Sequence, residues 1–140
     1  RNDISIVFQS YNLIHYMNAY ENVANAIEIA GRKVPNKKEY CLDILKKLGL
    51  SKEQSLRDIR KLSGGQQQRI AIARAKDVDL ILADEPTGNL DEKNSKEILK
   101  TFIDLAHQAN KCIIIVTHSP SLAQKCDVQL KIEDGQIVEI

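Results

Sequence analysis

Residues 63–86 read SGGQQQRIAIARAKDVDLILADEP, and this stretch predicts a helix followed directly by a strand. Ser63 stands three residues before Gln66, which is the spacing of a capping box. Good helix formers then continue to Ala75 without a breaker. We therefore expect a helix that begins at Ser63, with a short turn after Ala75.

The strand after this turn is one of two apolar strands joined by a helix. Residues 78–83 form a nearly continuous run of β-branched residues and leucines, closed by residues 84–86, and residues 112–117 form a second such run. Both runs predict strands buried on both faces. One helical face lies between Asp91 and Gln108, made of Ile98, Leu99, Phe102, Ile103 and Ala106. Strand, helix and strand in this order predict a right-handed crossover in a parallel sheet, so the fold class is α/β.

The flanking segments carry their own signals. Residues 4–8 read as a short strand that starts almost at the first residue, which hints at truncation. Residues 20–56 have helical spacing interrupted by glycine and proline, and predict a small helical lobe. At the other end, residues 128–132 and 136–140 surround an Asp-Gly pair, which predicts a hairpin.

Composition limits the choice of class. The 140 residues are 43% hydrophobic, which fits one domain or part of one. A net charge of +1 gives no uniform field to attract nucleic acid or an anionic membrane surface. The longest apolar runs, residues 80–83 and 112–116, fall far short of the ~20 residues that cross a bilayer, so we expect a soluble, cytoplasmic chain.

The three cysteines give no sign of a metal site or a disulfide framework. Cys41, Cys112 and Cys126 are odd in number, lack C-x-x-C spacing and lie in apolar or amphipathic surroundings. We expect buried, reduced thiols.

The candidate chemistry follows the strands. Ligands of parallel α/β sheets bind at the carboxyl ends of the strands, where Asp84, Glu85 and His118 stand. Asp84 suits a magnesium site and Glu85 could deprotonate an attacking water. A capped turn with solvated acids is the alternative for the pair, and a structural role the alternative for His118. Gln9 on its own is an ordinary polar residue at a strand end.

The helix start at Ser63 has two interpretations. Ser63, Gly64 and Gly65 present a hydroxyl, backbone N–H groups and the positive end of the helix dipole, with no side chains to block a phosphate. A plain helix cap by Ser63 and Gln66 explains the same residues equally well.

The residues of several motifs, taken together, favour the functional interpretations over the structural ones. Residues 62–69 (LSGGQQQR) resemble the ABC signature, and residues 80–85 (LILADE) resemble Walker B with its catalytic glutamate. The Q-loop, D-loop and H-switch are matched by residues 7–9, 89–91 and 117–118. These motifs occur in family order, so the chain resembles the ATP-binding domain of ABC transporters, and in particular the lipoprotein-release and macrolide-export branch.

The resemblance implies a partial P-loop NTPase fold across residues 1–140. Residues 10–62 would be the helical subdomain, residues 63–75 the signature helix, and residues 76–140 the core from Walker B to the H-switch with a C-terminal hairpin. The parent protein would be an ATPase that acts as the peripheral subunit of a membrane transporter, on the inner face of the cell membrane, with no nucleic-acid partner.

The resemblance also assigns roles, with ATP and Mg²⁺ as cofactors. Asp84 would hold Mg²⁺, Glu85 would act as the base and His118 would contact the γ-phosphate. Gln9 would touch the metal or the attacking water and relay the nucleotide state to the membrane subunit. In a head-to-tail dimer of ATPase subunits, the signature would complete the nucleotide site of the opposite subunit and Asp91 would cross the interface. The signature residues concerned are Ser63, Gly64, Gly65 and Gln66.

The sequence departs from the family in two places. The G-x-x-x-x-G-K-[ST] phosphate loop is absent, since none of the six glycines is followed by lysine. The aromatic residue that would stack on adenine is missing with it, so we expect the chain by itself to be inactive. The turn between Ala75 and Leu80 is also shorter than is usual in the family. Either this turn carries a true deletion, or residues are missing from the sequence at this point.

Two other functions are compatible with part of this pattern. ATPase heads of chromosome-maintenance or DNA-repair proteins share the signature and Walker B motifs, but they lead into long coiled coils, and no sustained heptads occur here. A non-catalytic regulatory module is favoured only if the natural gene also lacks the phosphate loop.

Overall fold

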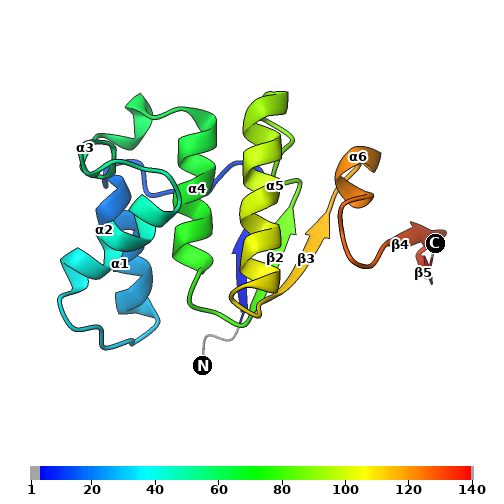
Figure 1. Cartoon of the computed structure of the whole chain (residues 1–140), viewed down its shortest axis with the longest axis horizontal. Helices are drawn as coiled ribbons and strands as arrows, with labels where there is room; N and C mark the ends of the chain where they lie inside the picture. The colour runs from blue at the N-terminus through cyan, green and yellow to red at the C-terminus, as the bar shows by residue number, and fades with distance from the viewer. Residues whose placement is uncertain (1–3, 140) are drawn as a thin grey trace.

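The computed structural model describes residues 4–139, which form a parallel sheet, a group of helices and a separate hairpin (Figure 1). The strands are β1 (Ile4–Val7), β2 (Leu80–Asp84), β3 (Cys112–Val116), β4 (Leu130–Glu133) and β5 (Gln136–Glu139). The helices are α1 (Ala19–Ile29), α2 (Lys37–Lys47), α3 (Lys52–Ser55), α4 (Gly64–Ala75), α5 (Glu92–His107) and α6 (Pro120–Ala123), with a 3₁₀ helix η1 (Ile59–Lys61).

The sheet has the order β1-β2-β3, and both pairs of strands are parallel. Val7 lies opposite Ala83, and Asp84 lies opposite Val116, so all three strands end at the same edge. Helices α4 and α5 lie next to each other in front of the sheet (Figure 1). The predicted α/β class is confirmed, as are the helix that begins at Ser63 and the strand, helix and strand that follow it.

One expectation about the sheet is wrong. The strands were expected to be buried on both faces, and only the face toward α4 and α5 is. Ile81 and Ala83 are buried on this face, whereas Ile114 is 51% exposed and Val116 57% exposed on the other. An apolar run shows that a strand can be buried on both faces, but neighbouring elements decide whether it is. Within residues 4–139, helices cover one face of the sheet.

The helical lobe, which we define as α1, α2, α3 and η1, packs against α4 and encloses its own core. Asn18 caps α1 in a reciprocal capping box with Glu21. Asn22, fully buried, accepts a hydrogen bond from the backbone N–H of Ile14 and donates to the carbonyl oxygens of residues 14, 17 and 18. The Asn22 side chain therefore supplies hydrogen-bond partners, from within the core, to backbone groups of the loop that leads into α1. The apolar core of the lobe consists of Ala19, Val23, Ile27, Cys41, Ile44, Leu45, Leu50 and Ile59.

The short turn between α4 and β2 is joined to the lobe by a half-buried polar cluster. The Tyr40 hydroxyl donates to both carboxylate oxygens of Asp77, at 2.9 and 3.0 Å, and Arg32 lies 3.6 Å from the same carboxylate. Burial, together with the bond to Asp77, raises the pKa of Tyr40 to about 12. Within this turn the Val78 N–H donates to the Ala75 carbonyl.

The C-terminal hairpin is confirmed, with β4 and β5 antiparallel. Asp134 and Gly135 both have positive φ, 47° and 76°, which is the conformation that a two-residue type I′ turn requires. Figure 1 shows the hairpin beyond α6, away from the sheet. Several of its apolar side chains are exposed, namely Leu130, Ile132, Ile137 and Val138.

The cysteines agree only in part with expectation. All three are free, but Cys41 alone is buried, whereas Cys126 is half-buried and Cys112 is exposed. Cys112 lies on the uncovered face of the sheet, so its exposure has the same cause as that of Ile114.

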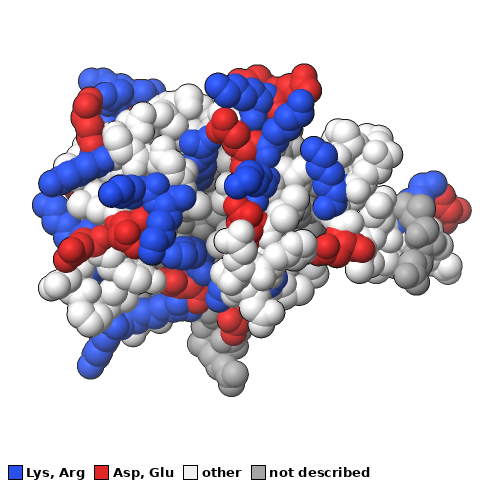
Figure 2. Space-filling view, viewed as in Figure 1, with Lys and Arg blue, Asp and Glu red and all other residues white. Residues whose placement is uncertain are grey.

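Charge is less evenly spread than the net value indicates. Residues 32–61 carry ten basic and four acidic side chains, which concentrates positive charge on the helical lobe. Figure 2 shows the lysine and arginine side chains gathered over this part of the molecule. No helix within residues 4–139 has the length and apolar character that crossing a bilayer requires.

Candidate functional site

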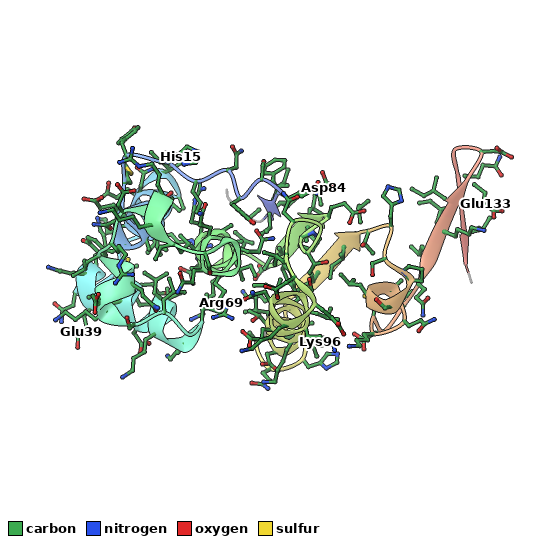
Figure 3. The ribbon with its side chains drawn as sticks, turned by 90° about the horizontal axis from the view of Figure 1, so that it is seen from above. His15, Glu39, Arg69, Asp84, Lys96 and Glu133 are labelled. Carbon is green, nitrogen blue, oxygen red and sulfur yellow. The ribbon has the colours of Figure 1, made fainter. Side chains whose placement is uncertain are left out.

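The predicted site residues at the strand ends share one edge of the sheet. Asp84 is the last residue of β2, and Figure 3 labels it there. Gln9 follows β1 by two residues, and His118 follows β3 by two. Because the strands are parallel and in register, the three residues emerge side by side at the carboxyl edge.

Glu85 turns away from the line of β2 toward the end of β3. Its backbone has a φ of 43°, which is uncommon for a residue with a side chain. This conformation is held by its own N–H, which donates to the Val116 carbonyl at 2.9 Å. Its side chain accepts hydrogen bonds from the Thr117 hydroxyl at 3.1 Å and from the His118 backbone N–H at 2.6 Å. The structure thus brings Glu85 and the H-switch residues into contact.

The His118 ring makes a looser approach. Its Nε2 lies 3.9 Å from Glu85 Oε1, and the side chain is fully exposed. The ring is therefore free to reach a ligand above the sheet edge, while the backbone of the same residue holds Glu85. The structural interpretation of His118 as a buried, satisfied histidine does not fit this exposure.

Gln9 lies against the turn that follows β2. Its Nε2 donates to Asn89 Oδ1 at 3.2 Å, and Asn89 Nδ2 donates back to the Gln9 carbonyl at 3.3 Å. A Cβ atom at Gly88 would lie 2.6 Å from Gln9 Nε2, so a side chain there would displace the Gln9 amide from its present position. Gln9 of the Q-loop and Asn89 of the D-loop are thereby joined, a contact that no local pattern in the sequence predicts.

The two residues predicted to hold magnesium, Asp84 and Gln9, stand at the same edge, and magnesium binding stays a prediction. Asp84 is exposed at the end of β2, and the amide oxygen of Gln9 is a second oxygen donor at the same edge. Within residues 4–139 no group of three histidine, cysteine or acidic side chains could hold a metal ion. Mg²⁺ commonly takes one or two carboxylates and completes its shell with water and substrate phosphates. The donors present fit that pattern.

The signature segment is a capped helix start. Ser63 Oγ accepts from the Gln66 N–H at 3.2 Å, and Gln66 Oε1 accepts from the Ser63 N–H at 2.9 Å. The capping interpretation of these residues is confirmed. The first N–H groups of a helix have no partner within it, so the backbone of Gly64 and Gly65 keeps the donors that an anion needs. A phosphate site here stays a prediction.

The two signature glycines also have neighbours in their own chain. A Cβ at Gly64 would lie 2.7 Å from the Tyr11 hydroxyl, and one at Gly65 would lie 2.4 Å from Asn94 Oδ1. A side chain at either position would therefore displace Tyr11 or Asn94, so these two glycines also have a packing role. The sequence pointed only to access, because Tyr11 and Asn94 are distant along the chain.

Asp91 caps α5. Its carboxylate accepts from the Asn94 backbone N–H at 2.8 Å and from Asn94 Nδ2 at 2.7 Å, and these bonds lower its pKa. Asn94 therefore connects Asp91 with Gly65. The signature and the D-loop residue are in this way neighbours within one chain, which is compatible with a shared surface at the top of α4 and α5 (Figure 1).

Sequence reasoning missed Gln68. This residue is fully buried in α4; its Nε2 donates to the Pro86 carbonyl at 2.8 Å, and its Oε1 has no partner among the described residues. It ties the signature helix to the residue after Glu85. A signal existed, because Gln68 lies one helical turn before the buried Ile72 and so on the same face.

Comparisons with known proteins agree with this geometry. A family model described as ABC transporter matches residues 1–88, which include Gln9, the signature and Asp84-Glu85. The ABC transporter ATP-binding protein YclH of Bacillus subtilis is 52% identical over 134 residues, which cover 94% of this chain and 59% of YclH. The macrolide export ATP-binding/permease protein MacB of Marinobacter nauticus is 43% identical over 141 residues, which cover 99% of this chain and 22% of MacB.

A solved structure gives the same result for the fold. The dimeric ATP-binding cassette MJ0796, in a post-hydrolysis state bound to ADP and Pi, matches with a TM-score of 0.83 at 32% identity. The match covers 98% of this chain and 62% of that one, so the chain spans about three fifths of the relatives' length apart from the much longer MacB. The chain belongs to the ABC transporter family and corresponds to part of its ATP-binding domain.

Proposed function

We propose that this chain is the part of an ABC transporter ATPase that activates water for ATP hydrolysis and reads the nucleotide of a second subunit. The observation that carries the proposal is the assembly of Gln9, Asp84, Glu85 and His118 at one sheet edge, with the Glu85 carboxylate fixed against the end of β3. In parallel α/β sheets this edge is where ligands bind.

Each residue at the edge has a chemical task in this proposal. Glu85 accepts the proton of the attacking water, which is within the ability of a carboxylate held by hydrogen bonds. The exposed His118 ring contacts the γ-phosphate. Asp84 and the Gln9 amide oxygen hold Mg²⁺, which supplies charge neutralisation for the phosphoryl group when bound.

The signature serves a neighbouring subunit. The free N–H groups of Gly64 and Gly65 at the start of α4 suit the phosphates of a nucleotide bound to the second subunit, in a head-to-tail dimer that Asp91 crosses. The dimeric state of the MJ0796 cassette supports this arrangement.

The transport role is export, powered through a membrane subunit on the inner face of the cell membrane. The MacB relative supports this, because it joins an ATP-binding part and a permease in one protein for macrolide export. Lipoprotein extraction is the related role that the wording of residues 84–91 also fits.

The decisive experiment replaces Glu85 in the full-length protein. Glu85→Gln should keep ATP binding and lower turnover by about 10²- to 10⁴-fold, because an amide cannot take the proton. Glu92→Gln, an exposed glutamate at the start of α5, is the matched control and should leave turnover unchanged. Near wild-type hydrolysis by Glu85→Gln would show that the base is assigned wrongly.

The chain of residues 1–140 alone should neither bind Mg-ATP tightly nor hydrolyse it. The β- and γ-phosphates in P-loop ATPases are cradled by the loop's N–H groups and lysine, and the sequence contains no such motif. Calorimetry with Mg-ATP and a phosphate-release assay test this. Micromolar binding with Glu85-dependent hydrolysis would contradict it and would reveal a substitute phosphate site.

A further inference from the structure

The Glu85 carboxylate is held at both of its oxygens by the residues that follow β3. Oε2 accepts from the Thr117 hydroxyl at 3.1 Å, and Oε1 accepts from the His118 backbone N–H at 2.6 Å. The His118 bond comes from the main chain and does not depend on the side chain at that position. The Thr117 bond is the one that a side chain controls.

Thr117 is itself oriented. Its Oγ1 accepts from the Ser119 backbone N–H at 3.1 Å, which occupies an acceptor position of the hydroxyl. A hydroxyl has one proton to donate, so the Thr117 proton is directed at Glu85. A β-branched side chain also has a restricted χ1, which limits the ways in which Thr117 can release the carboxylate.

The backbone of Glu85 cannot replace this restraint. The Glu85 N–H is bonded to the Val116 carbonyl and its φ is 43°, which fix where the side chain begins but not how its carboxylate is turned. Without the Thr117 hydroxyl, one bond to Oε1 would remain, and the carboxylate could rotate about it. The terminal torsion of a glutamate is broad and resists such rotation weakly.

We propose that Thr117 is a positioning residue for proton transfer in ATP hydrolysis, an inference that rests on the function proposed above. In that step the water oxygen bonds to the γ-phosphorus, and its proton passes to a Glu85 oxygen. The bond from the γ-phosphorus to the bridging oxygen breaks, and ADP leaves with the electron pair. Thr117 keeps the accepting oxygen aimed at the water, and positioning of this kind is a main source of catalysis in phosphoryl transfer.

The test uses the full-length protein and compares Thr117→Val, which has nearly the same shape, with Thr117→Ser, which keeps the hydroxyl. Thr117→Val should lower kcat by about 10- to 100-fold with little change in KM for ATP, since a small misplacement of a catalytic group has effects of this size. Thr117→Ser should recover most of the turnover. Thr101→Val is the matched control, because that hydroxyl on α5 donates to the Glu97 carbonyl at 3.0 Å, away from the strand ends.

A second comparison separates positioning from a general structural role. In a Glu85→Gln background, Thr117→Val should have no further effect on the residual rate, because residues that act as a unit are not additive. If Thr117→Val does not fold, Thr117→Ala removes the same hydroxyl with a smaller side chain and takes its place.

The outcomes are distinct. Wild-type kcat in Thr117→Val, or a loss in Thr117→Ser as large as that in Thr117→Val, would overturn the inference while Glu85→Gln stays inactive and the proposed function stands. An additional loss from Thr117→Val in the Glu85→Gln background would also overturn it. If the wild-type protein shows no turnover that depends on Glu85, the proposed function fails, and this inference fails with it.

Discussion

The helical lobe and the sheet differ in how completely their own residues bury them. Ile44 in the lobe is 1% exposed, whereas Ile114 in β3 is 51% exposed. The lobe wraps α1, α2, α3 and η1 around a core that includes part of α4. The sheet has helices on one face, and both the other face and the hairpin expose apolar side chains.

The difference teaches that local sequence pattern and burial are separate properties. Residues 112–116 are as apolar as any buried strand, and the side chains of β3 on one face are nevertheless exposed. The lobe is less apolar along its chain, and α2 is rich in lysine, but its few apolar side chains point inward together. We therefore expect stability to reside in the lobe and association to reside in the sheet.

The largest expected effect comes from truncating the lobe core. Ile44→Ala should lower the free energy of unfolding by about 2–5 kcal/mol, because it removes a buried side chain and leaves a cavity. The same change at Ile114, half in solvent, should cost less than about 1 kcal/mol. Urea denaturation of both variants, followed by circular dichroism, measures the difference. Equal losses would remove the distinction between the two regions.

The second test concerns the buried hydrogen bonds of Asn22 in the lobe. Asn22→Ala removes the donor and acceptor that satisfy the loop before α1, and should lower the free energy of unfolding by about 2–3 kcal/mol. Asn25→Ala changes the same residue type on the same helix at a half-buried position, and should have a much smaller effect. Similar losses in the two variants would mean that the buried network does not stabilise the lobe.

The third test concerns the hydrogen bond from Tyr40 to Asp77, which joins the lobe to the α4–β2 turn. Removing this bond should lower the free energy of unfolding by about 1 kcal/mol, the usual net value of a hydrogen bond. Tyr40 has an ordinary pKa of 10.0 that folding raises to about 12. The stability gained from the protonated hydroxyl is therefore fully present below pH 10, and it is lost as pH rises toward 12.

Tyr40→Phe lacks this hydroxyl, so it is the variant to compare. Wild type should be the more stable protein up to pH 10, and the gap should close between pH 10 and pH 12. The measurement is the free energy of unfolding of both proteins across this range. A gap that stays constant with pH would show that the Tyr40 hydroxyl does not hold Asp77 in solution.

A substitution on the exposed face of the sheet should have the smallest effect on the free energy of unfolding and the clearest effect on self-association. β3 is an edge strand among the described residues, and its exposed face is apolar, so we expect the isolated chain to self-associate. Ile114→Lys should reduce this association while changing the free energy of unfolding by less than about 1 kcal/mol. Light scattering measures the mass in solution.

Ile132→Lys is the control for the hairpin, where Ile132 is 70% exposed. If Ile114→Lys alone restores a monomer, the sheet drives association, and if Ile132→Lys does so, the hairpin drives it. A wild-type chain that is a clean monomer at high concentration would contradict the expectation as a whole.

The residues of the candidate site could be named in advance because they belong to contiguous motifs. The helix at Ser63, the strand that Asp84 ends and the cap at Asp91 each depend on a few neighbouring residues, and each lies where the pattern placed it. The contacts between them could not be named. Gln9 bonds to Asn89, eighty residues away, and Glu85 bonds to Thr117, thirty-two residues away.

The amino-acid sequence by itself determined the main strands, the helices between them, their order, the parallel sheet and the family, because periodicity, capping and motif wording are local properties of the chain. Only the tertiary structure decided which face of the sheet is covered, which side chains pack against Gly64 and Gly65, and which groups bond to the Glu85 carboxylate. These depend on side chains that meet only after folding, such as Tyr11 against Gly64 and Thr117 against Glu85. A contact between distant residues leaves no periodic pattern in either of them.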